Sequence, residues 1–464
     1  MWLGAAEWRL PKLSIHLSRL IDQVNVMRNL LVALLVTAAC GGDGDGRPVD
    51  AQPEADAPAA DSPVAELPPL APVTLTVLRD GKPVQGVHTY FLDFADVLVT
   101  TVDTDAAGTA SAVLTSGSVT AIDPFAPAQP DPERAIELRS WIGVKPGDHL
   151  VLSQSDPAPI TVTINAPRSP DATSYDMLTT CGREFDRGQP TGTITLSGCN
   201  GVADVLIVAR SRDGNSALYR SGVVVADQAT VDLTAGDYRP FKEVAFHYSH
   251  VPSTAESVSV DYEFGTPNGR LRDDFEDSTS AFVDGSATIT LAVPDIPDGF
   301  AALRHSIDLR AIHDIDERQA HATSYDLDLA GLLLPDWMEY PRYDAANRRI
   351  AWVDAAGGAA PDFQIGVLDV TPAAPTRRAA GSPAQPWNWL LIAPYTAGQL
   401  KLPALPNDVA DWTPQATDDV EGAGFAFKLP GGYDALREKV FTMGDDIDIR
   451  SVLADGERII HVEN

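Results

Sequence analysis

The sequence predicts an all-β protein built from antiparallel β-sandwich domains, and three observations indicate this class. Short apolar segments of alternating hydrophobicity recur through residues 73–164, 193–312 and 350–462. Gly, Pro, Asn or Asp stands between nearly all of them, as expected for turns. No long stretch has a 3.6-residue period, and a short helix is expected only at residues 433–441. Many short strands with frequent turns are typical of a β-sandwich.

Residues 27–40 have the order of an export signal. Arg28 supplies a positive charge, and residues 30–36 form an apolar run too short to span a bilayer. Two small residues then precede Cys40, which is typical of a cleaved leader rather than a membrane anchor. An apolar helix with a chance cysteine is the alternative.

The run TAAC at residues 37–40 resembles a bacterial lipoprotein signal, with Thr37 where leucine is usual. The resemblance implies that Cys40 is acylated, becomes the mature N-terminus and holds the protein to a membrane. Because Gly41 follows rather than aspartate, it also implies the outer membrane.

The segments on either side of this signal are not expected to form globular structure. Residues 1–26 would make an unusually long start for a leader, so we expect translation to begin at Met27. Residues 40–71 are rich in Gly, Pro, Ala and acidic side chains, with few large apolar ones. Such a segment cannot bury enough surface to offset its ordering entropy, so a disordered linker is expected.

Charge and cysteine content limit the partners and the compartment. The chain of 464 residues has a formal net charge of −31, which excludes nucleic acid as a partner because phosphate binding needs clustered Lys and Arg. If Cys40 is acylated, Cys181 and Cys199 remain as a pair, and a disulfide is expected in an oxidising compartment. A metal site at the two thiols is the alternative, but no histidine is near them in the sequence.

One stretch resembles a known family. The segments "DGKPVQGVHTYFLD" and "TTVDTDAAGTASAVLTSGSVTAID" are similar to the carboxypeptidase regulatory-like family, a transthyretin-like, Ig-type β-sandwich. The matching positions are Gly81, Pro83, Gly86, Thr104, Asp105, Gly108 and Gly117. The resemblance implies an Ig-like sandwich near residues 73–122 and no peptidase activity, because a fold does not carry function.

These observations predict tandem Ig-like or transthyretin-like sandwiches after a signal peptide and a linker. The expected segments are an upstream extension with the signal peptide (1–39), the linker (40–71), an Ig-like domain (72–165), a β-rich domain with the disulfide (166–330) and a Trp-rich β domain (331–464). Residues 172–176 and 322–326 share the sequence ATSYD, which is too short to indicate a repeat.

The chain carries no familiar catalytic or cofactor motif. We find no Gly-x-Ser-x-Gly, His-Glu-x-x-His, P-loop or Gly-x-Gly-x-x-Gly pattern, so no catalytic residue and no cofactor are predicted. A dispersed site remains an alternative because catalytic triads need no local signature. Asp103 and Asp105, and the acidic residues 445–448, could hold calcium, but turn geometry is the preferred interpretation.

Histidines recur at a spacing of eight, at His305, His313 and His321. Asp314, Asp316 and Glu317 lie close by in the sequence. Imidazole and carboxylate together can bind Zn²⁺ or a similar ion. Eight residues of strand span ~26 Å, so folding would have to bring these side chains together. Surface or turn histidines are therefore the preferred interpretation.

Five of the eight tryptophans lie in the C-terminal region, and Trp387 and Trp389 share one face of a predicted strand. Exposed, these two indoles would be candidate ligand-binding residues that stack on sugar rings. Inside a sandwich they would be core, which is preferred because large aromatics dominate such cores.

The sequence therefore favours a lipid-anchored envelope protein of Gram-negative type that acts as a non-catalytic binding or structural module. Its expected partners are the membrane, through the lipid, and an envelope protein or polysaccharide. The alternatives are an envelope hydrolase with a dispersed Asp, Glu and His site, and a glycan-binding protein that uses Trp387 and Trp389.

Overall fold

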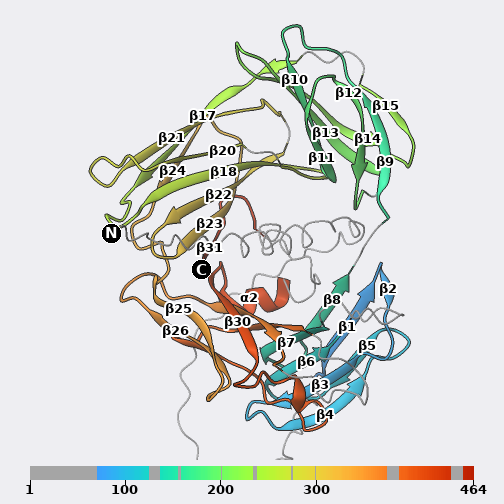
Figure 1. Ribbon diagram of the computed structural model, residues 1–464, viewed down its shortest axis with the longest axis vertical. Helices are drawn as coiled ribbons and strands as arrows, with labels where there is room; N and C mark the ends of the chain where they lie inside the picture. Colours follow the sequence, from blue (N-terminus) through green and yellow to red (C-terminus); the bar gives the residue numbers. More distant parts are fainter. Residues whose placement is uncertain are drawn as a thin grey trace, which may run out of the picture.

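The computed structural model describes residues 70–124, 136–154, 158–199, 201–233, 238–272, 275–297, 299–373, 386–439 and 453–463. Over these ranges the chain forms four two-sheet β-sandwiches (Figure 1). The predicted all-β class of tandem, mainly antiparallel sandwiches is confirmed. No helix in these ranges is long and apolar enough to cross a membrane.

The first sandwich follows directly on the predicted linker. One sheet contains β1 (Val73–Arg79), β2 (Lys82–Pro83), β5 (Thr109–Ala112) and β8 (His149–Gln154). The other contains β3 (His88–Asp93), β4 (Leu98–Asp103), β6 (Gly117–Ile122) and β7 (Ile136–Val144). Asp80 and Gly81 join β1 to β2 with φ of 50° and 69°, which is the conformation of a type I′ hairpin turn.

The second sandwich carries its own hydrophobic core and the disulfide. One sheet contains β9 (Ile160–Asn165), β12 (Thr191–Leu196) and β15 (Thr230–Asp232). The other contains β10 (Ser174–Thr179), β11 (Gly182–Arg187), β13 (Val202–Arg210), β14 (Ser216–Val224) and β16 (Arg239–Pro240). Every second side chain points inward, as in Val162 and Ile164 of β9, so alternation in the sequence becomes a core between the sheets.

The third and fourth sandwiches share one continuous core, which also takes in Leu178, Leu206 and Val208 from the outer face of the second sandwich. In the third sandwich, one sheet contains β17 (Lys242–Ser249), β21 (Ala287–Val293) and β24 (Ser324–Asp328). The facing sheet contains β18 (Ser257–Thr266), β19 (Gly269–Leu271), β20 (Glu276–Thr279), β22 (Phe300–Asp308) and β23 (Ile312–Gln319). In the fourth sandwich, one sheet contains β25 (Trp337–Asp344), β26 (Arg349–Asp354) and β29 (Gln399–Lys401). The facing sheet contains β27 (Phe363–Thr371), β28 (Trp387–Pro394) and β30 (Asp419–Lys428).

A single 13-stranded sheet runs through the first, third and fourth sandwiches. Its path is β19-β18-β22-β23-β31-β30-β27-β28-β7-β6-β3-β4, with β20 beside β18. Strand β31 (Arg458–Glu463) joins the third sandwich to the fourth, because it pairs with β23 on one side and β30 on the other. The parallel pair of β28 and β7 joins the fourth sandwich to the first.

The sheets divide the chain differently from the predicted boundaries. Strand β9 ends at residue 165 but pairs with β12 and β15, so it belongs to the second sandwich rather than the first. The predicted 166–330 domain contains most of two sandwiches, and the 331–464 segment contributes β31 to the third. These boundaries could not be predicted from the order of the strands in the sequence, because β9 and β31 pair with strands that are far away along the chain.

Two smaller predictions can be checked directly. The expected short helix is present as α2 (Gly432–Lys439), and a 3₁₀ turn, η1 (Ala410–Trp412), precedes it. The two ATSYD segments lie on β10 and β24, in different places of their sandwiches, so they are not a repeat. In both, the tyrosine hydroxyl bonds the backbone just upstream: Tyr175 to Ser169, and Tyr325 to Ala320. The shared letters therefore encode a local tyrosine-corner contact.

Candidate functional site

The candidate site is a group of buried ionisable side chains on the neighbouring strands β22, β23 and β31. Asp, Glu and Arg are rarely buried unless they are paired. The buried members are His305, His313, Asp314, Asp316, Glu317 and His461. Successive residues of a strand point to opposite faces of the sheet, so these side chains form two separate networks.

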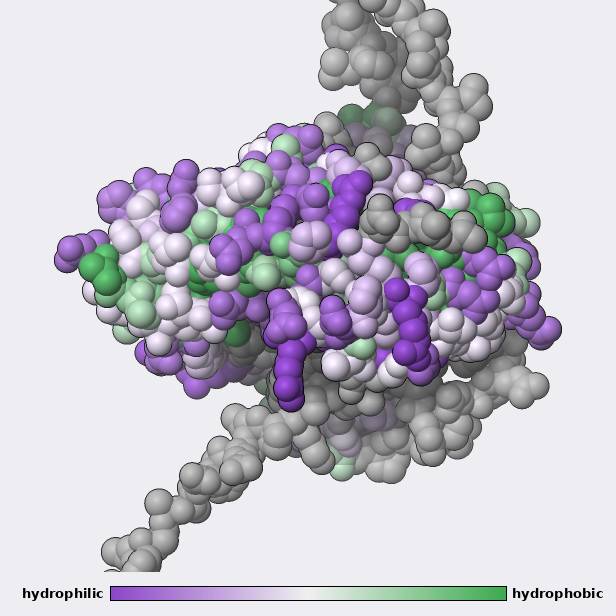
Figure 2. Space-filling view, turned by 90° about the horizontal axis from the view of Figure 1, so that it is seen from above, coloured by the Kyte–Doolittle hydropathy of each residue, from purple (hydrophilic) through white to green (hydrophobic). Residues whose placement is uncertain are grey.

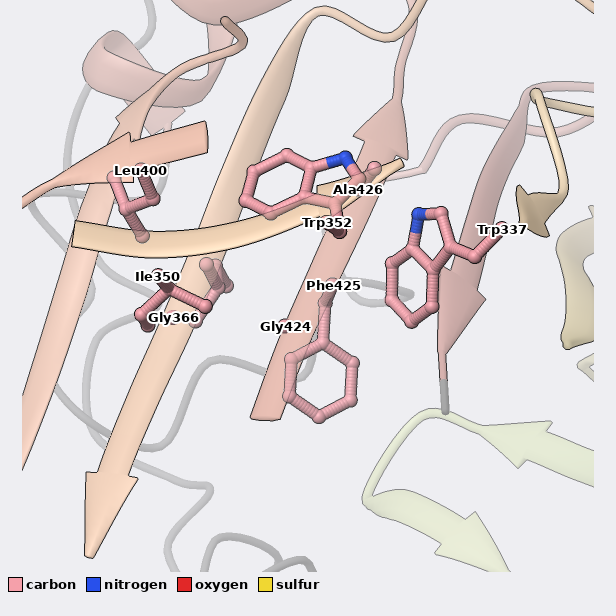
Figure 3. A pocket seen from close by; sticks show the side chains of 9 residues that line it. Trp337, Ile350, Trp352, Gly366, Leu400, Gly424, Phe425 and Ala426 are labelled. Atoms are coloured by element: carbon pink, nitrogen blue, oxygen red, sulfur yellow. The ribbon is translucent and has the colours of Figure 1, made fainter. Parts of the chain in front are cut away.

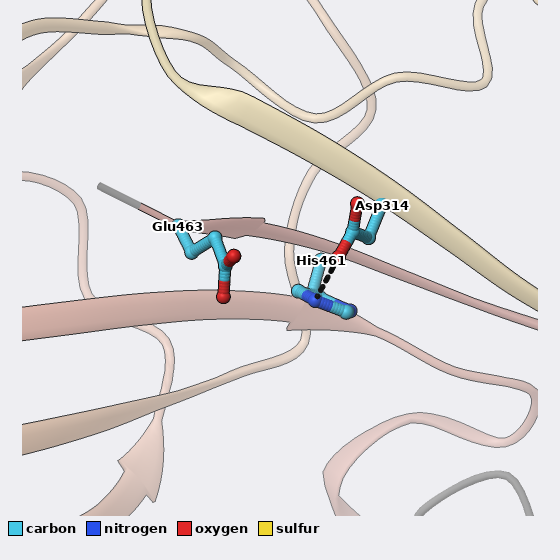
Figure 4. A group of neighbouring side chains, drawn as sticks. All are labelled: Asp314, His461 and Glu463. Atoms are coloured by element: carbon cyan, nitrogen blue, oxygen red, sulfur yellow. Dashed lines mark ion pairs between the residues drawn. The ribbon is translucent and has the colours of Figure 1, made fainter. Parts of the chain in front are cut away.

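The first network, here the Asp314 cluster, contains Arg304, Asp314, Asp316, His461 and Glu463. Strand pairing places Arg304 opposite Asp316 and Asp314 opposite His461. Arg304 Nε lies 3.1 Å from Asp316 Oδ1, and His461 Nε2 lies 3.2 Å from Asp314 Oδ2. The second ring nitrogen, His461 Nδ1, lies 3.7 Å from Asp316 Oδ2. Figure 4 shows the His461 ring between Asp314 and Glu463.

Burial and charge act against each other in this cluster. Burial alone would raise the pKa of Asp314, but the hydrogen bond and charge of His461, with Arg304, hold it well below its usual range. Burial would lower the pKa of His461, yet Asp314 and Asp316 raise it above its ordinary value. Burial raises the pKa of Glu463. The favoured state is therefore an ionised Asp314 against a protonated His461.

The second network, here the Glu317 chain, crosses the core of the third sandwich. The Tyr248 hydroxyl lies 2.9 Å from His305 Nδ1, and His305 Nε2 lies 3.1 Å from Glu317 Oε1. Arg458 Nε then donates to Glu317 Oε2 at 2.5 Å. The chain thus links four strands, β17, β22, β23 and β31.

Glu317 is held ionised in this chain. Burial would raise the pKa of Glu317, but the hydrogen bond and charge of His305, with those of Arg458, lower it to about 2. Burial raises the pKa of Tyr248 well above its usual range. Both side chains are enclosed among core residues, so the chain is suited to holding strands together rather than to meeting a substrate.

The expectation that the spaced histidines are surface or turn residues is wrong for two of them. His305 and His313 are buried, because inward-facing positions of β22 and β23 carry them into the core. Burial lowers the pKa of His313, against the opposing charge of Asp336, whose Oδ1 lies 3.7 Å from His313 Nε2. His321 is partly buried, with Nδ1 2.9 Å from the Tyr262 hydroxyl. The three rings do not converge on one metal position.

The residues that could hold a metal are a different set. Among the described ranges, one group offers three ligand atoms within 4.8 Å of one another, and it is Asp314, His461 and Glu463. Of these, sequence reasoning considered only Asp314. His461 and Glu463 lie on β31 about 150 residues away, and their signal in the sequence is polar side chains alternating with apolar ones in a buried strand.

The predicted cysteine pair is present. Cys181 and Cys199 form a disulfide with a Cα–Cα distance of 5.5 Å, between the β10–β11 turn and the segment after β12. The rival metal site at these thiols is therefore excluded in this structure. Cys40, the predicted lipidation site, lies outside the described residues.

The proposal of a sugar-binding platform at Trp387 and Trp389 is wrong. Both side chains are fully buried. Trp389 Nε1 donates to Ser140 Oγ at 2.9 Å, and Trp387 meets Trp412 edge to face at 5.9 Å. Strand β28 lies inside the 13-stranded sheet, and its inner face packs on the sheet of β25, β26 and β29. The preferred interpretation of core tryptophans is confirmed.

A small apolar cavity lies between that sheet and strands β27 and β30 (Figure 3). Trp337, Trp352 and Leu400 contribute to its lining, and its volume of about 10 Å³ is at the lower limit for one water molecule. Gly366 and Gly424 pair across β27 and β30 there, and a Cβ on Gly366 would clash with Leu400 and lie only 2.6 Å from Ile350, so the glycine lets these side chains pack against the strand. The cavity is a packing gap and is too small for a substrate.

The preferred interpretation of the Asp103–Asp105 loop is confirmed for Asp105. Its Oδ1 accepts hydrogen bonds from the backbone N–H groups of Ala107 and Thr109, at 2.8 and 3.0 Å. The carboxylate therefore stabilises the turn before β5. The second acidic segment, residues 445–448, lies outside the described ranges.

Comparisons with known proteins leave the family open. No family model matches the chain, and no curated protein matches it. Among solved structures, the Bacillus anthracis TIE protein aligns at 11% identity and a TM-score of 0.15, over 56% of this chain and 51% of that one. The chain thus spans about half the length of that protein.

Two further solved structures align with this chain at similarly low scores. BcpA, the major pilin subunit of Bacillus cereus, aligns at 10% identity and a TM-score of 0.14, over 56% of this chain and 98% of that one. Two B repeat units of the collagen-binding protein of Staphylococcus aureus align at 10% identity and a TM-score of 0.13, over 78% and 95%. At these scores, neither collagen binding nor pilus assembly transfers to this chain.

Proposed function

We propose that the protein is an exported, lipid-anchored module of the Gram-negative cell envelope that binds or supports other envelope components without catalysis. The observation that carries this proposal is the Cys181–Cys199 disulfide. Disulfides persist in oxidising compartments and are rare in the cytosol. The signal-like residues 27–40 and the polar stretch 40–71 provide an export route and a tether in the same chain.

The architecture is suited to a mechanical or docking role. One continuous sheet runs through three of the four sandwiches, so these three form a stiff unit rather than separate domains joined by flexible linkers. The face seen from above in Figure 2 is mostly hydrophilic, with hydrophobic residues in small separate groups. Such a surface fits contacts with polar partners, and an envelope protein or a polysaccharide is the proposed partner class. The net charge of −31 opposes nucleic acid.

An envelope hydrolase is the second candidate, and the clustering of Asp314, Asp316 and His461 is the observation in its favour. A hydrolase needs such groups beside an opening that admits substrate, whereas these three side chains are at most 10% exposed. The lowered pKa of Asp314 makes its carboxylate a weak base, and the raised pKa of His461 favours the protonated ring, which cannot accept a proton. The arrangement therefore favours the module.

Metabolic labelling with radioactive palmitate tests the anchor. The expected result is label on the wild-type protein in the membrane fraction and none on the Cys40→Ser variant. A Cys181→Ser/Cys199→Ser double variant is the matched control and should keep the label. Wild-type protein that is acyl-free, with both remaining thiols reduced after extraction, would overturn the proposal. Affinity capture from envelope extracts with the labelled protein then identifies the partner.

A further inference from the structure

We propose that Asp314, His461 and Glu463 form a binding site for one divalent transition-metal ion of the Zn²⁺ type, which fastens β31 to β23. The inference is independent of the proposed envelope role. It concerns the joint at which β31 closes the 13-stranded sheet between the third and fourth sandwiches.

The ligand geometry is close to that of a metal site. His461 Nε2 and Asp314 Oδ2 are 3.2 Å apart. Two ligands at ~2.0–2.1 Å from a tetrahedral ion are themselves ~3.4 Å apart, so an ion fits beside both atoms with little movement. Glu463 supplies the third ligand atom, within 4.8 Å of the others, and rotation of its side chain can close that gap.

Two buried polar atoms at this position have no hydrogen-bond partner. They are Asp314 Oδ1 and His461 Nδ1, on side chains that are 4% and 10% exposed. An unsatisfied buried polar atom costs ~1–3 kcal/mol, so such atoms call for an explanation. A cation beside Asp314 would satisfy the carboxylate, and loss of the Nε2 proton to the metal would leave the Nδ1 proton to donate toward Asp316.

Asp316 and Arg304 are placed as the outer shell of such a site. A metal-bound histidine usually donates its second N–H to a carboxylate, which fixes the ring and its tautomer. Asp316 Oδ2 lies 3.7 Å from His461 Nδ1 and is the carboxylate in that position. Arg304 Nε holds the other oxygen of Asp316 at 3.1 Å.

The charges of the cluster also balance with a divalent ion. Asp314, Asp316 and Glu463 carry three negative charges when ionised, and Arg304 supplies one positive charge. A divalent ion on a neutral His461 brings the sum for these five residues to zero, which is the same sum that protons on His461 and Glu463 give, so the ion can take the place of those two protons. The set of one imidazole and two carboxylates suits Zn²⁺ and similar ions better than Ca²⁺ or Mg²⁺, which prefer oxygen ligands alone.

The test is a titration of the purified full chain, freed of metal with a chelator, with zinc chloride. Calorimetry should give one saturable site per chain, and the thermal midpoint should rise with Zn²⁺ concentration. Asp314→Asn and Glu463→Gln should each weaken binding more than about 100-fold, since even outer-shell changes cost 10–100-fold. Far-UV circular dichroism confirms that each variant is folded.

A matched control is the exposed pair of His250 and Asp328, in which His250 Nδ1 lies 2.7 Å from Asp328 Oδ1. His250→Gln should leave Zn²⁺ affinity unchanged. If the ligand variants do not fold, Co²⁺ bound to the wild type provides a second readout. Tetrahedral Co²⁺ with a nitrogen ligand absorbs visible light, and added Zn²⁺ should displace the Co²⁺ and remove that absorption. A wild-type chain without saturable Zn²⁺ binding, or binding that survives both ligand substitutions or depends on His250, overturns the proposal.

Discussion

The carboxylate of Glu317 illustrates how one buried residue holds several strands. It accepts from His305 of β22 and from Arg458 of β31, and its own strand lies between them. Gln319 also donates to Glu317 Oε2, at 3.4 Å. Breaking a buried ion pair by removing one partner is strongly destabilising, because it leaves the other charge uncompensated.

We predict that this carboxylate makes the protein less stable in acid. Its pKa falls from the ordinary value of 4.5 to about 2 in the folded chain. The folded state therefore binds the proton more weakly than the unfolded state, so the stabilisation is present above pH 4.5 and is lost as the pH falls toward 2. The full effect is about 3 kcal/mol.

Thermal unfolding of the wild type and of Glu317→Gln between pH 7 and pH 3 measures this effect. The wild type should lose more stability than the variant on acidification, and their midpoints should converge at low pH. The difference in stability between wild type and variant at each pH cancels the contributions of the other carboxylates, which both proteins share. Parallel pH profiles for the two proteins would contradict the assignment.

At the scale of elements, the sequence predicted much of the local structure. The short helix at 433–441 could be predicted, and the type I′ turn at Asp80–Gly81 has a sequence signal of the same kind, because both signals lie within a few residues. The disulfide could be predicted because acylation of Cys40 would leave two cysteines, and an even number of cysteines in an oxidising compartment is expected to pair.

Strand pairing could not be predicted in the same way. The sequence favoured the core for Trp389 from its residue type, but it could not show that β28 lies beside β7, about 250 residues away in sequence. His461 was missed for the same reason, because its partner Asp314 belongs to a distant strand. Register between remote strands depends on tertiary packing, and local patterns do not contain it.

The disulfide is expected to stabilise mainly the second sandwich. It closes a loop with a sequence separation of 18, for which the chain-entropy model gives about 3 kcal/mol. The inner core around β9, β10, β12 and β13 is a separate cluster, whereas Leu178, Leu206 and Val208 on the other face of β10 and β13 belong to the core of the third and fourth sandwiches. A Cys181→Ala/Cys199→Ala variant should therefore lower the unfolding midpoint of the second sandwich most, with a smaller effect on its neighbours.

Hydrogen exchange resolved by segment tests this expectation. Protection should fall in β9 to β14 and persist in β18, β22 and β27. Wild-type protein treated with a reductant should show the same pattern and is the matched comparison. A uniform fall in protection along the whole chain would mean that the second sandwich is coupled to the rest.

On the scale of the whole molecule, β31 connects two halves of a sheet that would otherwise end at β23 and β30. It pairs on both sides over most of its length, and Ile459, Ile460 and Val462 are buried. Removing it would expose two unpaired strand edges at the centre of the molecule, which is a recognised route to aggregation.

Ile460→Pro should therefore disturb the third and fourth sandwiches together. Ile460 pairs with Ile315 of β23 and Lys428 of β30, and proline would remove a ladder hydrogen bond in the middle of the sheet, where proline is not tolerated. Hydrogen exchange should speed up in β22, β23, β27 and β30, while β9 to β14 stay protected as an internal control. The matched variant Ile460→Val keeps the strand and should change little. If Ile460→Pro left protection in β23 and β30 intact, the two halves would be stable without β31, and the sheet would not be the element that makes the molecule one unit.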